Sequence, residues 1–315
     1  MNAVADTARR EPTATVATPR AYLLLAVVIV LWGANWPVMK VGLDYIPPLW
    51  FAVARLVLGA VALFLVLATT RRLVLPSRHD LPILLSVGVL QMGGFLILIN
   101  LGLERVPAGR SAVLAYTTPL WVAPGAVLLL QERLGRFEAI GLGLGLAGIA
   151  LLFNPAEFPW ADRRAVIGNL LLMLAALSWA CAILHARAHR WRASPLQLAP
   201  WQMLIAIPPV LVLALALEDW GRIRWTGELM LVLAYNGPIA TAFCYWAAVT
   251  VTRALPAVST SLGFLGVPVT GVLFAAATLG EPLGAGLMGG LLLIIGGLAL
   301  VNTADLRRAR INHQK

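Results

Sequence analysis

The chain has 315 residues, of which 60% are hydrophobic and only 12% are charged, and its mean hydropathy is +0.85. Soluble domains carry roughly 25% charged residues, so this composition excludes a soluble enzyme, a nucleic-acid-binding domain and a disordered chain. The net charge of +10 does not indicate nucleic-acid binding, because nearly all of the 24 Lys and Arg residues lie in gaps between apolar runs. The composition is typical of a polytopic membrane protein in contact with the lipid bilayer.

Ten apolar stretches reach or approach the roughly 20 residues that a membrane-spanning helix needs. The fifth is short, and we expect Arg136 and Glu138 to extend it by snorkelling. The predicted spans are Ala21–Met39, Leu49–Thr70, Leu81–Leu103, Ala112–Leu130, Ala139–Phe153, Val166–Ala186, Leu196–Leu217, Leu229–Thr250, Ala257–Leu279 and Leu283–Asn302.

The basic residues predict the orientation of these spans. With the N-terminus in the cytoplasm, 16 Lys and Arg residues fall in cytoplasmic segments, 7 fall in outer loops, and Arg55 lies inside the second span. Short cytoplasmic loops carry the excess of Lys and Arg. We therefore expect a bacterial-type inner membrane protein with two cytoplasmic tails, residues 1–20 and the basic residues 303–315.

An internal repeat divides the chain into residues 21–153 and 166–302. When Pro107–Leu152 is laid on Pro256–Val301 at an offset of 149, 14 of 46 positions are identical. The matches include two prolines and a glutamate, which are informative because only 14 residues of the chain are acidic. Each half holds five spans, and five is odd, so the second half enters the membrane from the opposite side. The pattern predicts an all-α membrane protein of ten helices in two inverted five-helix repeats, an architecture that transporters use.

Three stretches of the sequence resemble the EamA family of the drug/metabolite transporter superfamily. They are LLLAVVIVLWGANWPVMKVGLDYIPPLWFAVAR at 23–55, GRSAVLAYTTPLWVAPGAVLLLQERLGRFEAIGLGLGLAGIALL at 109–152 and LPAVSTSLGFLGVPVTGVLFAAATLGEPLG at 255–284. The resemblance implies ten helices and metabolite transport, frequently amino-acid export. The family's Gly-Glu turn is intact at Gly280-Glu281 but reads Gln131-Glu132 in the first half, which we expect to loosen that turn.

Aromatic and amide side chains inside the spans are the candidate substrate-binding residues. Trp32, Asn35 and Trp36 have the spacing i, i+3 and i+4 and so share one face of the first helix. The resemblance implies that this helix and five others, the third, fourth, sixth, eighth and ninth, surround a central cavity, although helix packing is the alternative role for each residue alone. The remaining candidates are Gln91, Tyr116, Trp179, Asn236 and Phe264.

The charged groups near the spans allow fewer conclusions. Glu132 and Glu281 stand at helix boundaries, where we interpret them as turn caps; proton carriage is the alternative. No Asp or Glu lies between the ends of any predicted span, which argues against a carboxylate relay. Arg55 either reaches the membrane interface, bonds free carbonyls near Pro47-Pro48, or binds a substrate carboxylate. His185, near the end of the sixth span, is expected at the interface.

No motif supports enzymatic chemistry, a cofactor or a metal. Gly143, Gly145 and Gly148 satisfy G-x-G-x-x-G, but the dinucleotide fingerprint requires a preceding strand, and these glycines lie in a membrane span. Small residues four apart favour close helix packing instead. No hydrolase motif and no cluster of Cys and His is present.

The sequence therefore predicts an inner-membrane transporter that exports small neutral or zwitterionic metabolites, such as amino acids, by alternating access. An organic-anion or nucleotide-sugar carrier is the alternative within transport. An integral membrane enzyme is the alternative outside it.

Overall fold

A computed structural model of the chain describes residues 18–131, 135–153, 158–189, 191–255, 260 and 263–313, and within these residues every regular element is helical. Within the same residues, seven helical stretches are long and apolar enough to cross a membrane, and three shorter apolar helices accompany them. Each of the ten overlaps one predicted span. Apolar side chains such as Leu65 and Leu128 are largely exposed, as expected for a surface that faces lipid.

The elements follow the chain in two sets. The first set is α1 (Thr18–Gly42), α2 (Pro48–Thr69), η1 (Arg78–Asp80), α3 (Leu81–Ser86), η2 (Val87–Gly94), α4 (Phe95–Arg105), α5 (Ala108–Ala115), α6 (Thr118–Leu130) and α7 (Arg136–Leu152). The second set is α8 (Arg163–Ala188), α9 (Pro195–Leu217), η3 (Trp220–Arg222), α10 (Gly227–Ala234), η4 (Tyr235–Phe243), α11 (Cys244–Ala254), α13 (Gly266–Leu279) and α14 (Ala285–His313).

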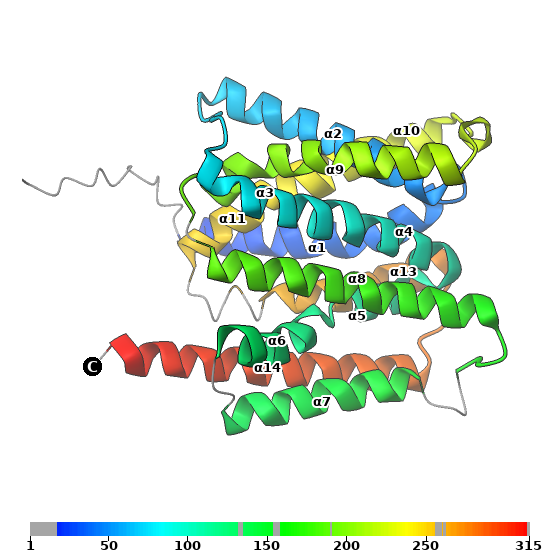
Figure 1. Ribbon diagram of the computed structural model, residues 1–315. Helices are drawn as coiled ribbons and strands as arrows, with labels where there is room; N and C mark the ends of the chain where they lie inside the picture. The colour runs from blue at the N-terminus through cyan, green and yellow to red at the C-terminus, as the bar shows by residue number, and fades with distance from the viewer. Residues whose placement is uncertain are drawn as a thin grey trace, which may run out of the picture.

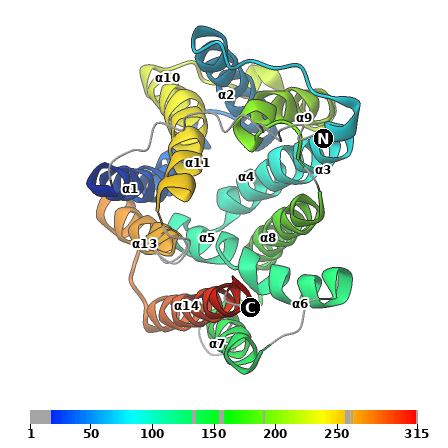
Figure 2. The ribbon, with the colours of Figure 1, turned by 90° about the vertical axis from the view of Figure 1, so that its left-hand side faces the viewer.

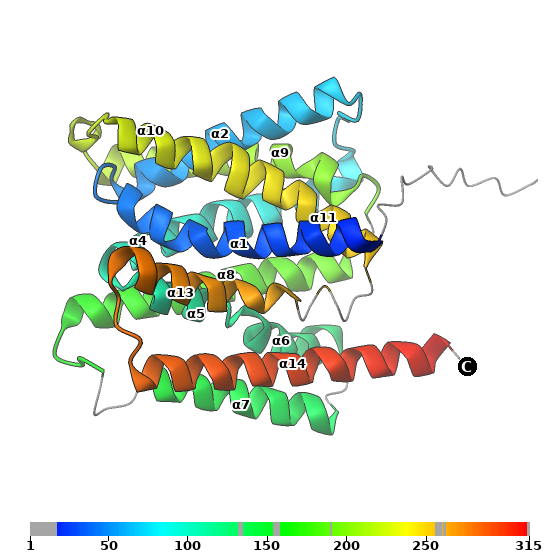
Figure 3. The same cartoon turned by 180° about the vertical axis from the view of Figure 1, so that it is seen from behind.

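The helices run roughly parallel to one another, so the molecule has two ends (Figure 1). The start of α1 and the finish of α14 lie at the same end, which Figure 3 shows from behind. We name this the terminal end. The opposite end, where α1 finishes and α2 begins, is named the distal end.

The third and eighth spans are not regular α-helices, although their apolar patterns predicted nothing unusual. Each contains a π-helical segment, η2 in the third span and η4 in the eighth. Pro238 removes one backbone donor within η4. Gly88 in η2 lets the backbone approach α9, because a Cβ there would lie 2.9 Å from the carbonyl oxygen of Gln202. Segments of this kind are frequent at functional sites.

The fourth span is broken near its middle. Helix α5 ends at Ala115 and α6 begins at Thr118, with Pro119 in the first turn of α6. Proline is tolerated in a first turn, where its missing N–H has no intrahelical partner. The break places Tyr116 at a helix end inside the bundle, and α13 begins with Pro268 in the same manner.

Helices α7 and α14 lie side by side at one edge of the bundle, as Figure 2 shows. Their glycines face one another. A Cβ at Gly141 would lie 2.5 Å from the carbonyl oxygen of Gly297, and one at Gly148 would lie 2.8 Å from that of Gly290. Of the three glycines that resemble a dinucleotide fingerprint, Gly145 and Gly148 therefore belong to this close helix contact, whereas Gly143 faces open space.

The remaining contacts form pairs across the two sets. Helix α1 packs on α13 as α8 packs on α6, and α2 packs on η4 as α9 packs on η2. Helix α4 packs on α8 as α11 packs on α1, and α2 and α9, which occupy corresponding places, pack on one another. These contacts between the two sets thus recur with the roles of the sets exchanged.

Candidate functional site

A cavity of about 270 Å³ lies within the bundle, between elements of the two sets. It contains six of the eight side chains that the sequence selected, namely Trp32, Asn35, Trp36, Gln91, Tyr116 and Trp179. Among the described residues that line it, Arg55 alone carries a formal charge. The other lining residues are Met39, Leu56, Met92, Phe95, Leu96, Ile99, Met203, Ala240, Thr241, Tyr245, Ala248, Val249 and Thr252.

Helix α1 presents one polar and two aromatic side chains to the cavity. The indole N–H of Trp32 donates to the carbonyl oxygen of Ala240 in η4 at 2.8 Å. Trp36 and Asn35 are each only 5% exposed. Among the described residues, no donor reaches the side-chain oxygen of Asn35, so this residue brings a buried and unsatisfied acceptor to the lining of the cavity.

The first set and α8 complete the aromatic wall. Gln91 comes from η2, and Tyr116 comes from the break between α5 and α6. Trp179 of α8 meets Phe95 of α4 edge-on, with ring centroids 4.8 Å apart. The two irregular features of the third and fourth spans therefore both place a polar group at the cavity.

Two of the selected residues do not line the cavity. Asn236 is fully buried in η4, where its side-chain nitrogen donates to the carbonyl oxygen of Val232 at 3.2 Å. Phe264 packs against Trp32, with ring centroids 5.7 Å apart. Both lie next to the site. Asn236 accepts a hydrogen bond from the lining residue Thr241 at its backbone carbonyl, and Phe264 packs on the indole ring of Trp32.

The sequence did not select several lining residues, because an apolar or hydroxyl side chain inside a span carries no distinctive signal. Thr241 is one, and its hydroxyl donates to the carbonyl oxygen of Asn236 at 2.7 Å while accepting from Nε of Arg55 at 3.0 Å. Met39 is another, with its sulfur 3.0 Å from a guanidinium nitrogen of Arg55. Arg55 itself was detectable as the single strong charge inside a span.

The lining of the cavity approaches a different end of the bundle on different helices. On α11 it continues to Thr252, two residues before that helix finishes at Ala254 at the terminal end, and on α1 it continues to Met39, three residues before that helix finishes at Gly42 at the distal end. Beyond the lining at the distal end lie Ile46, Leu49 and Leu103, all buried in the main apolar cluster. This end is closed by packed side chains.

Glu281 reinforces the closure of the distal end. Its carboxylate accepts hydrogen bonds from the backbone N–H groups of Ala108 at 2.5 Å and Gly109 at 2.8 Å, at the start of α5. A carboxylate at a helix N-terminus satisfies free N–H groups and opposes the positive end of the helix dipole. Glu281 follows α13, so this contact joins the second set of helices to the first. The corresponding residue of the first set, Glu132, lies outside the described residues.

Glu218 forms the same kind of contact at the start of α2. Its two oxygens accept from the backbone N–H of Leu49 at 3.0 Å each, and one also accepts from Trp50 at 3.2 Å. Burial raises the pKa of this carboxyl above its usual range, and the two backbone donors oppose that shift. Nearby, Arg224 donates to the carbonyl oxygen of Asp44, which also links the two sets.

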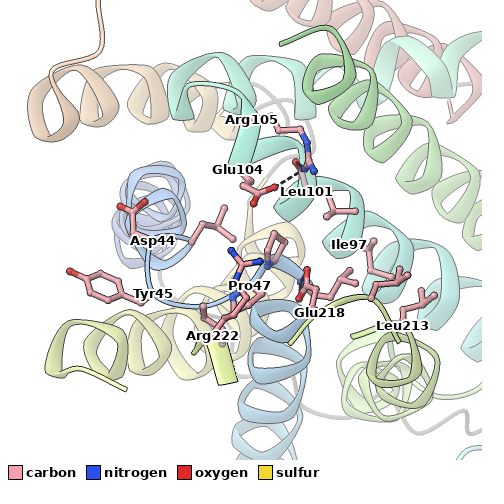
Figure 4. A pocket seen from close by; sticks show the side chains of 15 residues that line it. Asp44, Tyr45, Pro47, Ile97, Leu101, Glu104, Arg105, Leu213, Glu218 and Arg222 are labelled. Carbon is pink, nitrogen blue, oxygen red and sulfur yellow. Dashed lines mark hydrogen bonds and ion pairs between the residues drawn. The ribbon is translucent and has the colours of Figure 1, made fainter. Parts of the chain in front are cut away.

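A second pocket, of about 340 Å³, opens at the distal end around Glu218 (Figure 4). Glu104 and Arg105 form an ion pair at 2.8 Å on its wall. Because this pair and Glu218 are already engaged with protein groups, the pocket is a weaker candidate than the central cavity. It lies beyond the closure, on the distal side.

His185 lies away from the cavity, near the terminal end. Its Nδ1 is 2.6 Å from the hydroxyl oxygen of Ser86. The neighbouring His189 has its Nε2 3.7 Å from the buried carboxylate of Asp80. Asp80 also accepts from the hydroxyl of Ser77 at 2.7 Å, so these groups join the second and third spans to the loop after α8.

Comparison with known proteins identifies a family. The profile of the EamA-like transporter family matches residues 19–154 and 166–303. The "Uncharacterized transporter YoaV" of Bacillus subtilis (strain 168) is 29% identical over 284 residues, which cover 90% of this chain and 97% of that protein. A "Probable amino-acid metabolite efflux pump" of Salmonella typhimurium is 30% identical over 293 residues, covering 87% of this chain and 92% of that protein.

One solved crystal structure is similar in fold. Its TM-score is 0.63 at 20% sequence identity, and the match covers 93% of this chain and 99% of that chain.

Proposed function

Because the chain belongs to the EamA-like transporter family, we propose that it exports small neutral or zwitterionic metabolites, such as amino acids, across a bacterial inner membrane. The family and the apolar helices make it a multi-pass membrane protein of a transporter class. In our proposal, ten helices form two inverted repeats, residues 21–153 and 166–302, that rock about the central cavity.

The paired contacts support the two-repeat architecture. The contacts between the two sets described above recur with the roles exchanged, as for α1 with α13 and α8 with α6. The two π-helical segments occupy corresponding spans, the third and the eighth. Helices α1 and α14 place the two termini at one end, which requires an even number of crossings.

The chemistry of the cavity carries the proposal about substrates. Its volume of about 270 Å³ suits a small solute, below the roughly 300–1,000 Å³ typical of sites for drug-sized ligands. Aromatic and methionine side chains line it, together with two amides (Asn35 and Gln91), several hydroxyl groups and one cation. A small molecule with an apolar part and few charges fits these groups.

Export follows from the position of the cavity. The excess of Lys and Arg supports a cytoplasmic terminal end, and on α11 the lining of the cavity comes within two residues of the helix end there. The distal end is closed by packed leucines and by Glu218 and Glu281. This arrangement receives solute from the cytoplasm, and rocking of the repeats would release it on the other side.

A carrier of organic anions or nucleotide sugars is the second candidate, and Arg55 is the observation that favours it. Sugar phosphates and nucleotides carry several negative charges, which are usually held by clustered cations. Among the described lining residues, Arg55 is the one cation. We therefore rank this candidate below neutral and zwitterionic solutes.

Counterflow into proteoliposomes tests the proposal. Purified protein should exchange labelled L-phenylalanine or L-leucine for the same unlabelled amino acid inside, without altering it chemically. Exchange of a nucleotide sugar but of no neutral amino acid would favour the second candidate. Covalent change of the solute would indicate an enzyme and contradict both.

A further inference from the structure

Arg55 holds a positive charge in the cavity that the described protein does not neutralise. A guanidinium has five N–H donors, yet the acceptors it reaches are the hydroxyl of Thr241 at 3.0 Å and the sulfur of Met39 at 3.0 Å. A thioether is a weak acceptor. Among the described residues, no carboxylate forms an ion pair with Arg55, although a buried cation without a partner is costly.

The titratable groups around this guanidinium are also neutral. They are the hydroxyls of Tyr116 and Tyr235 and the thiol of Cys244, none of which ionises appreciably near neutral pH. Tyr235 is further engaged by donating its hydroxyl to the carbonyl oxygen of Leu31. The counter-charge for Arg55 must therefore come from outside the described chain.

Asn35 supplies a complementary group at the same cavity. Met39 contacts Arg55 and lies four residues after Asn35 on α1, so the side chains of Asn35 and Met39 share one face of that helix. The side-chain oxygen of Asn35 is buried and lacks a donor. A cation and an unpaired acceptor at the same cavity are complementary to a carboxylate and an ammonium group that are both attached to one carbon atom.

We propose that Arg55 binds the carboxylate of the substrate and that Asn35 accepts a hydrogen bond from its ammonium group. The inference rests on the function proposed above and narrows it to α-amino acids with one carboxylate. The side chain of the solute then lies among Trp32, Trp36 and Trp179, which favours large apolar groups. A solute with a second carboxylate would find no second cation among the described lining residues. An amine that lacks a carboxylate would leave Arg55 without a counter-charge.

Three related compounds test this assignment with the intact protein. L-phenylalanine has both charged groups, L-phenylalaninamide lacks the carboxylate, and 3-phenylpropionate lacks the ammonium. We expect the wild-type protein to bind phenylalanine about tenfold or more tightly than the amide, because charge-assisted bonds to a carboxylate are lost. Binding is measured by calorimetry in detergent and by competition for counterflow in proteoliposomes.

Variants identify the residues responsible. Arg55→Gln should weaken phenylalanine binding about tenfold or more and abolish the preference over the amide, whereas Arg55→Lys should retain part of it. Asn35→Leu should abolish the preference for phenylalanine over 3-phenylpropionate. Arg72→Gln, an exposed position after α2, is the matched control and should preserve both preferences.

The outcomes separate this inference from the proposed function. If the wild type exchanges phenylalanine but binds the amide equally well, the inference is wrong and the export function stands. The same holds if Arg55→Gln keeps the preference for the carboxylate. If no neutral amino acid is exchanged at all, the proposed function fails first. Should Arg55→Gln not fold, the three-compound comparison on the wild type still decides.

Discussion

Removal of the Glu281 carboxylate should lower the free energy of unfolding by an amount that can be estimated from the hydrogen bonds it accepts. The two oxygens accept from Ala108 N–H at 2.5 Å and Gly109 N–H at 2.8 Å, and both of these residues are buried. Glu281→Ala leaves two donors unsatisfied. An unsatisfied buried donor costs about 1–3 kcal/mol, and loss of a helix cap costs about 0.5–2 kcal/mol. Because these two estimates overlap, we expect about 2–4 kcal/mol.

Glu281→Gln provides the graded comparison. Its amide keeps one oxygen acceptor and loses the charge, so we expect about half of the effect of Glu281→Ala. Glu228→Gln removes a charge at the same end from an exposed side chain in the first turn of α10, and it should cost clearly less than Glu281→Ala, because an exposed charge interacts only weakly with a helix dipole.

The assay is reversible unfolding in mixed micelles titrated with SDS, followed by circular dichroism. A change below about 0.5 kcal/mol for Glu281→Ala would refute the capping argument. It would show that water satisfies the α5 N-terminus once the carboxylate is removed.

The other predictions concern the cavity, a turn, the driving force and the topology. Trp36→Ala should reduce counterflow far more than folded yield, and equal losses would assign this face to packing alone. Gln131→Gly should raise stability by about 0.5–1 kcal/mol, because Gln131 has φ 55° and the corresponding Gly280 has φ 66°; a loss of stability in the same SDS titration would contradict this. Proteoliposomes under a pH gradient of about two units should not accumulate solute, since no carboxylate or histidine lines the described cavity. Accumulation that a protonophore abolishes would contradict this and would make His185 the first residue to test. A reporter active only in the periplasm and fused after Lys315 should stay silent, whereas activity there would invert the proposed orientation.

The sequence predicted the positions of the helices well because apolar length is a direct physical requirement of the bilayer. It did not predict the π-helical segments or the break after Ala115. These depend on which backbone groups find partners across the bundle, as when Trp32 donates to Ala240. The turn at Gln131-Glu132 was expected to loosen, yet Gln131 adopts the left-handed conformation of Gly280.

The candidate site shows the same division. A face of α1 could be read from the spacing of Trp32, Asn35 and Trp36, since helical geometry fixes that relation. Asn236 could not be separated from this group, because an amide in a span has the same signature whether it faces a cavity or a backbone carbonyl. The capping partner of Glu281 was equally hidden, since α5 begins 173 residues earlier in the chain than Glu281.

The closure of the distal end has a kinetic consequence. Opening it separates Glu218 and Glu281 from two helix N-termini, so an empty carrier should spend most of its time with the cavity open toward the terminal end. Apparent affinity falls with the fraction of protein in the competent state, so half-saturation should occur at lower concentration at the terminal end, which is the cytoplasmic side in the proposed orientation. In a carrier without ion coupling, the ratio of maximal rate to half-saturation must nevertheless be equal in both directions. Efflux would then have the lower half-saturation and the lower maximal rate, and influx the higher value of each.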